Sequence, residues 1–108
     1  MTAQLLADLK AVRALLAEPT AWTKGAMSRD PYGFVAYPRA SSATCWRALG
    51  AVEKCAPITR DQLRQGLGFA TDRSITEWND APERTHSDVI AVLDTTIARI
   101  EKEAGNVG

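Results

Sequence analysis

Apolar residues recur at helical spacing in two long segments of the chain. The first stripe consists of Leu5, Leu6, Leu9, Val12, Leu15 and Leu16. The second stripe consists of Val89, Ile90, Leu93, Ile97 and Ile100. Side chains three and four residues apart share one face of an α-helix, so both segments are predicted to be amphipathic helices. Pro19 is expected to end the first helix and Gly105 the second.

A helix of small and apolar residues is predicted in the middle of the chain, from Ala43 to Glu53. The hydroxyl groups of Ser41 and Ser42 are expected to cap its first free amides. Gly50 lowers the intrinsic stability of this helix by up to about 1 kcal/mol relative to alanine. We therefore predict a tight crossing there, where another backbone approaches the helix.

Capping patterns indicate two further helical segments before the last helix. Thr59 with Gln62 three residues later predicts a helix that starts near position 59. Ser74 with Glu77 repeats the pattern and predicts a short helical turn, Ile75 to Asn79.

The region between the first two helices predicts a small β-hairpin. Asp30-Pro31-Tyr32-Gly33 has residues typical of the first, second and fourth positions of a type I turn. The flanks Lys24–Ser28 and Phe34–Tyr37 are expected to pair. Because an isolated hairpin is only marginally stable, its apolar side must pack on the helices. The expected contacts are Trp22, Met27 and Phe34.

Length and composition favour one globular domain over residues 1–108. Apolar residues make up 45% and charged residues 24% of the chain, as in ordinary soluble proteins. With the elements above, the predicted fold is mainly α: a compact bundle of about four helices with a small β-hairpin after the first helix.

The charges balance overall but are unevenly distributed. Thirteen basic and thirteen acidic residues give zero net charge, which supplies no general attraction to a phosphate backbone, so no nucleic-acid partner is expected. Between Thr20 and Arg60, six basic residues face two acidic ones, whereas acidic residues predominate from Asp61 onward. The main interpretation is mutual neutralisation in the fold. The alternative is a basic face, including Arg29 and Arg39, for an acidic partner.

The sequence predicts a cytoplasmic protein without membrane contact. No segment approaches the roughly 20 apolar residues of a membrane span. Asp8 and Lys10 interrupt the apolar stretch that a signal peptide would require. Cys45 and Cys55 are placed on one predicted helix about 15 Å apart, too far for a disulfide. Reduced cysteines are typical of the cytoplasm.

The nine residues WNDAPERTH, Trp78 to His86, concentrate polar side chains around the only histidine. We interpret the segment as a corner between helices. Asn79 and Asp80 are turn formers, and Thr85 caps the last helix together with Asp88 three residues later.

A reactive site is the alternative interpretation of the same residues. His86 would act as a general base, oriented by Asp80 or Asp88, with Arg84 binding an anionic group. Because Thr85 and His86 lie at a helix N-terminus, the free amides could also hold a phosphate or carboxylate.

No metal or cofactor is expected. One histidine and two distant cysteines do not match zinc-ligand spacing, and no calcium-loop, P-loop or dinucleotide-binding pattern is present. The three tryptophans, Trp22, Trp46 and Trp78, are interpreted as core or core-edge residues with hydrogen-bonded indoles. The alternative is that Trp22, beside the hairpin, is an exposed interface anchor.

Three segments together carry a resemblance to known proteins. They are WTKGAMSRD, CWRALGAV and WNDAPERTHSDVIAVLDTTI. The chain resembles a family of small uncharacterised bacterial and bacteriophage proteins, and the WND-x-P-x-RTH block is the most specific part. The resemblance implies a soluble intracellular protein, and it transfers an architecture without a mechanism.

The expected function is that of a non-enzymatic protein-interaction or regulatory module, such as a phage accessory factor acting on a host or phage protein. The residues expected to bind the protein partner are Trp22, Arg29, Arg39, Arg84 and His86. The alternative is a small hydrolase or transferase that uses His86, Asp80 and Arg84.

Overall fold

The computed structural model describes residues 2–105, which form a mainly helical domain with a small antiparallel sheet after the first helix. The five α-helices are α1 (Thr2–Leu15), α2 (Ala48–Cys55), α3 (Arg60–Gly66), α4 (Asp72–Asp80) and α5 (His86–Gly105). The smaller elements are the 3-10 helix η1 (Pro19–Ala21) and the strands β1 (Ser28–Arg29) and β2 (Cys45–Trp46). The predicted fold class is confirmed.

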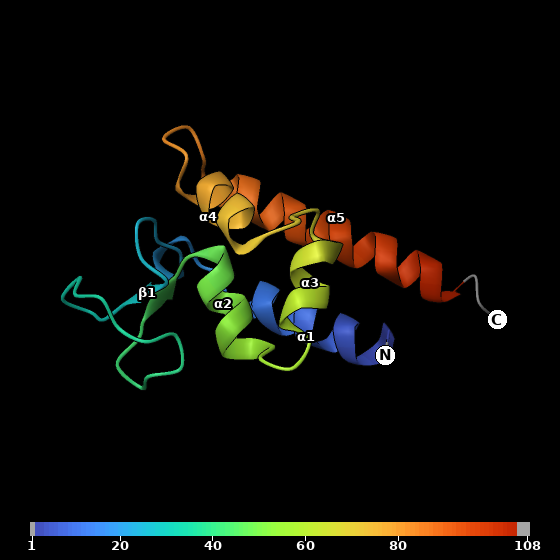
Figure 1. Ribbon diagram of the computed structural model, residues 1–108, viewed down its shortest axis with the longest axis horizontal. Coiled ribbons are helices and arrows are strands. Elements are labelled where there is room, and N and C mark those ends of the chain that lie inside the picture. The colour runs from blue at the N-terminus through green and yellow to red at the C-terminus, as the bar shows by residue number, and fades with distance from the viewer. Residues whose placement is uncertain (1, 106–108) are drawn as a thin grey trace.

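The two long amphipathic helices pack against each other in the core. α1 lies against α5, and the shorter helices cover this pair (Figure 1). The fully or nearly fully buried apolar cluster comprises Leu9, Val12, Leu16, Trp46, Ala51, Val52, Ala56, Leu63, Val89, Leu93 and Ile100. Both predicted apolar stripes therefore face the core, because helical periodicity places their residues on one side.

The helix predicted from Ala43 starts later, at Ala48, and the prediction was wrong for the preceding residues. Cys45 and Trp46 form β2, and Ser41 and Ser42 lie outside the helix. The Trp46 carbonyl accepts a hydrogen bond from the Thr23 backbone N–H at 3.1 Å. Tertiary pairing thus overrides the local helical pattern. The two cysteines consequently lie on different elements, and both are free thiols.

The close crossing predicted at Gly50 is confirmed. A Cβ atom at this position would lie only 1.9 Å from the Met27 carbonyl oxygen. The same carbonyl accepts the Arg47 backbone N–H at 3.2 Å. Gly50 is therefore required, because the backbone at Met27, just before β1, runs directly against the backbone of α2.

The caps of α3 and α4 differ from those predicted. The Thr59 side chain does not cap α3, and its hydroxyl instead donates to Asp8 on α1 at 2.6 Å. Thr71, rather than Ser74, is the N-cap of α4, and the two residues exchange reciprocal hydrogen bonds. The predicted short turn is consequently a helix of nine residues.

The predicted turn forms, but the strand after it is not the main partner of β1. The Gly33 N–H donates to the Asp30 carbonyl at 3.0 Å, and Arg29 and Val35 form an antiparallel bridge. The paired strand is β2, with Ser28 opposite Trp46. The expectation that Phe34 packs on the helices was wrong, because its side chain is exposed.

The basic and acidic segments partly neutralise each other. Arg47 pairs with Asp80 at 3.3 Å, and Arg60 pairs with Asp72 at 2.8 Å. Across residues 2–105, neither Arg29 nor Arg39 takes part in an ion pair. Two cations near the sheet therefore remain uncompensated by an acidic side chain.

Candidate functional site

Asn79 is the centre of the polar corner between α4 and α5. Its side chain is 0% exposed. The amide oxygen accepts the Trp22 indole N–H at 2.7 Å and the Ala48 backbone N–H at 2.9 Å. The amide nitrogen donates to the Thr23 carbonyl at 3.1 Å and to Asp80 at 2.9 Å. One buried amide thus joins the segment after η1, the start of α2 and the end of α4.

The charged side chains of the corner are engaged with backbone carbonyls and a tryptophan ring of the same chain. Arg84 donates to the Trp78 carbonyl at 2.9 Å, and its guanidinium lies 4.4 Å from the Trp78 ring centroid, a cation–π distance. The Lys24 ammonium donates to the Ala81 carbonyl at 2.7 Å. These contacts hold the α4–α5 connection against the segment that follows η1.

His86 ties the start of α5 to the end of the α1 region. Its Nε2 lies 2.6 Å from the Leu16 carbonyl oxygen, and its ring centroid lies 6.4 Å from that of Trp22. A carbonyl oxygen can only accept, so Nε2 carries the proton and donates. This structural bond engages the Nε2 proton, so a general base at this position would have to use the Nδ1 lone pair.

The predicted Thr85–Asp88 cap of α5 is confirmed. The Thr85 backbone N–H donates to the Asp88 carboxylate at 2.9 Å, and the Asp88 N–H donates to the Thr85 hydroxyl at 3.2 Å. The bond from the Thr85 backbone N–H lowers the pKa of the Asp88 carboxyl below its ordinary value of 3.8, and the nearby Arg84 cation adds to this effect.

This cap predicts an acid-dependent contribution to stability. Because the folded-state pKa of Asp88 is lowered, its stabilisation is present above the unfolded value of 3.8 and is lost as the pH falls through the folded value. We expect Asp88→Asn to melt below the wild type at pH 6, and this difference to narrow as the pH falls below 3.8. Thermal melts across this range test it, with the exposed neighbour Ser87→Ala as control. A gap for Asp88→Asn that is constant with pH would contradict the cap assignment.

The three residues of the catalytic alternative are engaged with different partners. Asp80 binds Asn79 and Arg47, Arg84 binds the Trp78 carbonyl, and His86 binds the Leu16 carbonyl. Across residues 2–105, no hydrogen bond or ion pair joins any two members of this trio. The corner thus resembles a structural junction more than an acid–base site.

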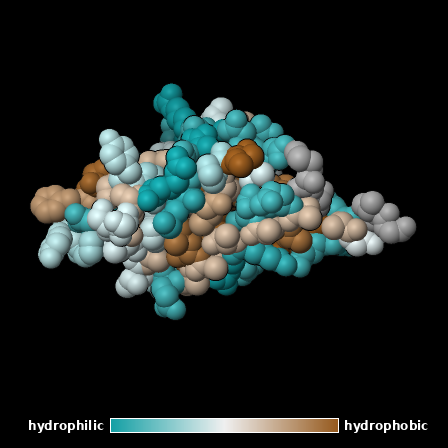
Figure 2. Space-filling model, turned by 90° about the horizontal axis from the view of Figure 1, so that it is seen from below, coloured by the Kyte–Doolittle hydropathy of each residue, from teal (hydrophilic) through white to brown (hydrophobic). Residues whose placement is uncertain are grey.

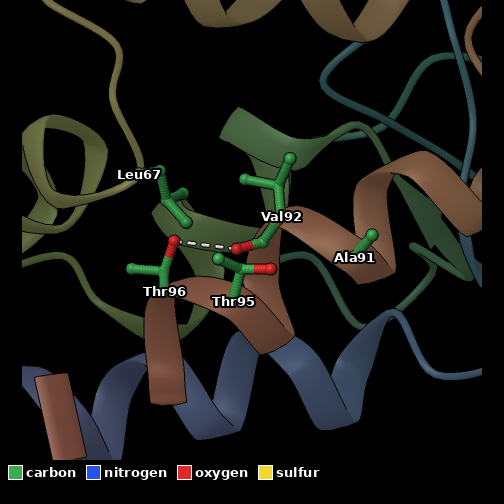
Figure 3. Close-up of a pocket in the computed structure, with 5 residues that line it drawn as sticks. All are labelled: Leu67, Ala91, Val92, Thr95 and Thr96. Atoms are coloured by element: carbon green, nitrogen blue, oxygen red, sulfur yellow. Dashed lines mark hydrogen bonds between the residues drawn. The ribbon is translucent and has the colours of Figure 1, made fainter. Parts of the chain in front are cut away.

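A shallow hollow of about 330 Å³ lies on the surface of α5 beside Leu67. Figure 3 shows its lining, in which the Thr96 hydroxyl donates back to the Val92 carbonyl at 2.8 Å. The other lining residues are Ala91 and Thr95. None of these side chains can act as a general acid or base near neutral pH, because none titrates there.

A second hollow of about 360 Å³ lies between α1 and the α2–α3 connection. Two of its lining residues, Asp8 and Cys55, are ionisable. Asp8 accepts hydrogen bonds from Gln4 and Thr59. Burial raises the pKa of the Cys55 thiol, which favours the neutral form over the nucleophilic thiolate. The pair is therefore suited to packing rather than to nucleophilic chemistry.

The described part of the chain holds no cluster of three histidine, cysteine, aspartate or glutamate residues arranged to bind a metal ion. No helix among the same residues combines the length and apolar character needed to cross a membrane.

Large apolar side chains instead gather on the segment Pro31–Tyr37, which we call the aromatic loop. The exposed fractions are 86% for Tyr32, 71% for Phe34, 72% for Val35 and 84% for Tyr37. The loop projects from the end of the molecule opposite the labelled chain ends (Figure 1). Apolar side chains protrude from this end in the space-filling view (Figure 2).

The aromatic loop is held in place by its polar backbone. The Asp30 carboxylate accepts the Tyr32 and Phe34 backbone N–H groups, each at 2.9 Å. The Trp46 indole N–H donates to the Pro38 carbonyl at 2.9 Å, which fixes the far end. These bonds fix the backbone of the loop, while its large apolar side chains remain exposed.

Sequence analysis did not single out this loop as a candidate binding surface. It expected Phe34 to pack on the helices and placed Tyr32, Val35 and Tyr37 only in the turn and strand of the predicted hairpin. A signal was available in the composition: both tyrosines of the chain lie within these seven residues. Tyrosine is enriched at protein interfaces because it combines a large apolar face with a polar end.

The residues predicted to bind a partner fall into two groups. Trp22, Arg84 and His86 are partly buried and make the internal bonds of the corner. Arg29 and Arg39 lie beside the aromatic loop. Arg29 donates to the Gly33 carbonyl at 3.0 Å, and Arg39 is exposed. Of the second group, Arg39 is exposed, whereas Arg29 is partly buried and also donates to the Lys24 carbonyl.

These features describe a small helical domain with a rigid polar junction and an exposed aromatic loop. The chain belongs to a family of unknown function, DUF6197, whose model matches residues 1–99. This assignment agrees with the predicted resemblance to an uncharacterised family. No curated protein and no solved structure matches the chain.

Proposed function

We propose that the protein is a non-enzymatic protein-interaction module that acts in the cytoplasm and binds its partner through the aromatic loop. The observation that carries this proposal is the exposure of four large apolar side chains on one anchored loop. Scattered exposed apolar residues are ordinary in soluble proteins, whereas a gathered group is typical of an interaction site. A regulatory or accessory role on a host or phage protein is consistent with this surface.

The arrangement of the loop supports binding rather than packing. Its side chains point away from the core, while hydrogen bonds to Asp30 and from Trp46 fix its backbone. A surface that is fixed before binding loses less conformational entropy when the partner docks. Aromatic residues are also the most frequent anchors of protein interfaces.

Quantitative affinity capture from cells of the encoding organism tests the proposal. We expect the triple variant Tyr32→Ser, Phe34→Ser and Tyr37→Ser to capture at least about tenfold less of a specific partner, because the docking anchors are removed. The variant should fold, because these side chains lie outside the core. Circular dichroism and thermal melts check this.

The matched control is Ile58→Ser. Ile58 is 96% exposed but lies on the α2–α3 connection, away from the aromatic loop. It should retain the same partner as the wild type. Equal capture by the triple variant and Ile58→Ser would refute the proposed surface. Loss of the biological effect in a folded His86→Gln variant that still captures the partner would favour the enzymatic alternative.

A further inference from the structure

The aromatic loop carries the open edge of a small sheet. Phe34 and Ala36 direct their backbone groups toward β1: the Asp30 N–H donates to the Phe34 carbonyl at 2.8 Å, and the Ala36 N–H donates to the Ser28 carbonyl at 3.1 Å. Backbone groups alternate in direction along an extended segment. The N–H and C=O of the intervening Val35 therefore point away from the sheet, and neither has a hydrogen-bond partner among the described residues.

The opposite edge of the same sheet is already covered. β2 pairs with β1 on one side and is bridged by Trp22 on the other, where the Thr23 N–H donates to the Trp46 carbonyl. The strand edge that is free to accept another chain within residues 2–105 is therefore the one at Val35. A hollow of about 290 Å³, lined by Val35, Ala36 and Tyr37, lies along it.

The chain segment that carries this edge is basic. Within residues 19–52 the only carboxylate is that of Asp30, and it is occupied by the Tyr32 and Phe34 amides. Arg29, the antiparallel neighbour of Val35, bonds to the Gly33 and Lys24 carbonyls and to no carboxylate. Arg39 is exposed two residues beyond Tyr37. A ligand with carboxylates would therefore complement the edge electrostatically.

We infer that the Val35 edge binds an extended acidic peptide segment of a partner protein by β-strand addition. The partner backbone pairs with the N–H and C=O of Val35. Its apolar side chains contact Phe34 and Tyr37, and its carboxylates lie toward Arg29 and Arg39. Main-chain pairing supplies affinity, and alternate side chains supply specificity in this mode of recognition. This inference rests on the proposed function and specifies its partner.

Two other occupants fit the same surface less well. A second copy of the chain would bring Arg29 and Arg39 against their own counterparts, so like charges would oppose pairing. A lipid surface would accept the aromatic side chains, but it would leave the Val35 N–H and C=O without partners in an apolar medium, which is unfavourable.

Selection from a displayed library of random twelve-residue peptides tests the inference with the intact chain. We expect enrichment of peptides in which carboxylates alternate with apolar residues. The best enriched peptide is then measured by fluorescence anisotropy against two variants. Val35→Pro removes the outward N–H without breaking an internal bond and should weaken binding by at least about tenfold. Val35→Thr keeps the N–H and should weaken it by less than about threefold.

A second measurement keeps the test decisive if Val35→Pro does not fold. The same peptide, N-methylated at alternate residues, cannot pair along one edge and should bind the wild type at least about tenfold more weakly. Enrichment of basic or proline-rich peptides, or of none, would overturn the inference. Unchanged binding of the N-methylated peptide would overturn it too.

The competing occupants have their own readouts. Sedimentation equilibrium that detects a dimer abolished by Val35→Pro would assign the edge to a second copy and overturn the inference. Binding to phosphatidylserine vesicles that is lost in the triple aromatic variant, and kept in Val35→Pro, would assign the loop to a lipid surface. If affinity capture of a folded partner requires the aromatic loop but not the Val35 N–H, the proposed function stands and strand addition fails.

Discussion

Replacing Asn79 by alanine is expected to lower the free energy of unfolding by about 3 kcal/mol, because buried donors lose their acceptor. The Trp22 indole N–H and the Ala48 backbone N–H both donate to the Asn79 oxygen. Each buried unsatisfied polar group is unfavourable by roughly 1–3 kcal/mol, and alanine also leaves a small void. Urea titration followed by circular dichroism measures the change.

Two control variants distinguish the loss of the Asn79 hydrogen bonds from a general effect of substitution. Trp22→Phe removes one donor and keeps the Ala48 bond, so a smaller loss is expected. Gln62→Ala changes an exposed residue of α3 and should alter stability by less than about 0.5 kcal/mol. If Asn79→Ala is no more harmful than Gln62→Ala, the buried amide does not join the elements energetically.

Replacing Gly50 by alanine is the second change with a large expected effect. Alanine normally stabilises a helix interior by up to about 1 kcal/mol relative to glycine. Here its Cβ atom would meet the Met27 carbonyl oxygen at 1.9 Å and the carbonyl carbon at 2.8 Å. Because both atoms belong to the backbone, α2 must move away from the segment before β1. We expect a net loss of about 3 kcal/mol in the free energy of unfolding.

Gly66 offers a matched control in another helix. It is the last residue of α3, and an added Cβ would meet nothing within 4 Å. Gly66→Ala should therefore be neutral or stabilise by about 0.5 kcal/mol. The denaturant midpoint should fall for Gly50→Ala and stay unchanged or rise for Gly66→Ala. A Gly50→Ala protein as stable as the wild type would show that the crossing is looser than the structure indicates.

The polar corner explains why a sequence that looks reactive need not be catalytic. Asn79 has all of its side-chain hydrogen-bonding groups engaged, and His86 donates to a carbonyl. Such a network specifies one arrangement of the joined elements, because a shifted arrangement would leave buried polar groups unpaired. The three residues of the catalytic alternative, Asp80, Arg84 and His86, are distributed around this junction.

Helical periodicity alone was sufficient to predict α1 and α5, because both follow a local sequence pattern. The stripes of α1 and α5 follow the 3.6-residue repeat, and both bury the predicted face. The Thr85–Asp88 cap and the Asp30–Gly33 turn were also predicted correctly, because each is a bond between residues a few positions apart. The sequence likewise indicated the close crossing at Gly50. Glycine destabilises a helix interior, and a close approach by another backbone is a physical reason to place it there.

The candidate binding surface could not be predicted in the same way. The sequence does not distinguish an exposed Phe34 from a buried one, because burial of the side chain depends on which helices lie close enough to cover it. The sequence analysis therefore placed Phe34 against the helices. Similarly, the acceptor used by His86 is a carbonyl 70 positions away, which no local spacing encodes.

The sequence by itself determined the two long helices, the Thr85–Asp88 cap, the Asp30–Gly33 turn and the mainly α class. Only the tertiary structure decided that Cys45–Trp46 is a strand, that Asn79 joins three segments, and that the loop after β1 faces solvent. The physical reason is the range of the interactions. Local hydrogen bonds and periodic burial are encoded within a few residues, whereas strand partners and buried polar networks depend on contacts between distant positions.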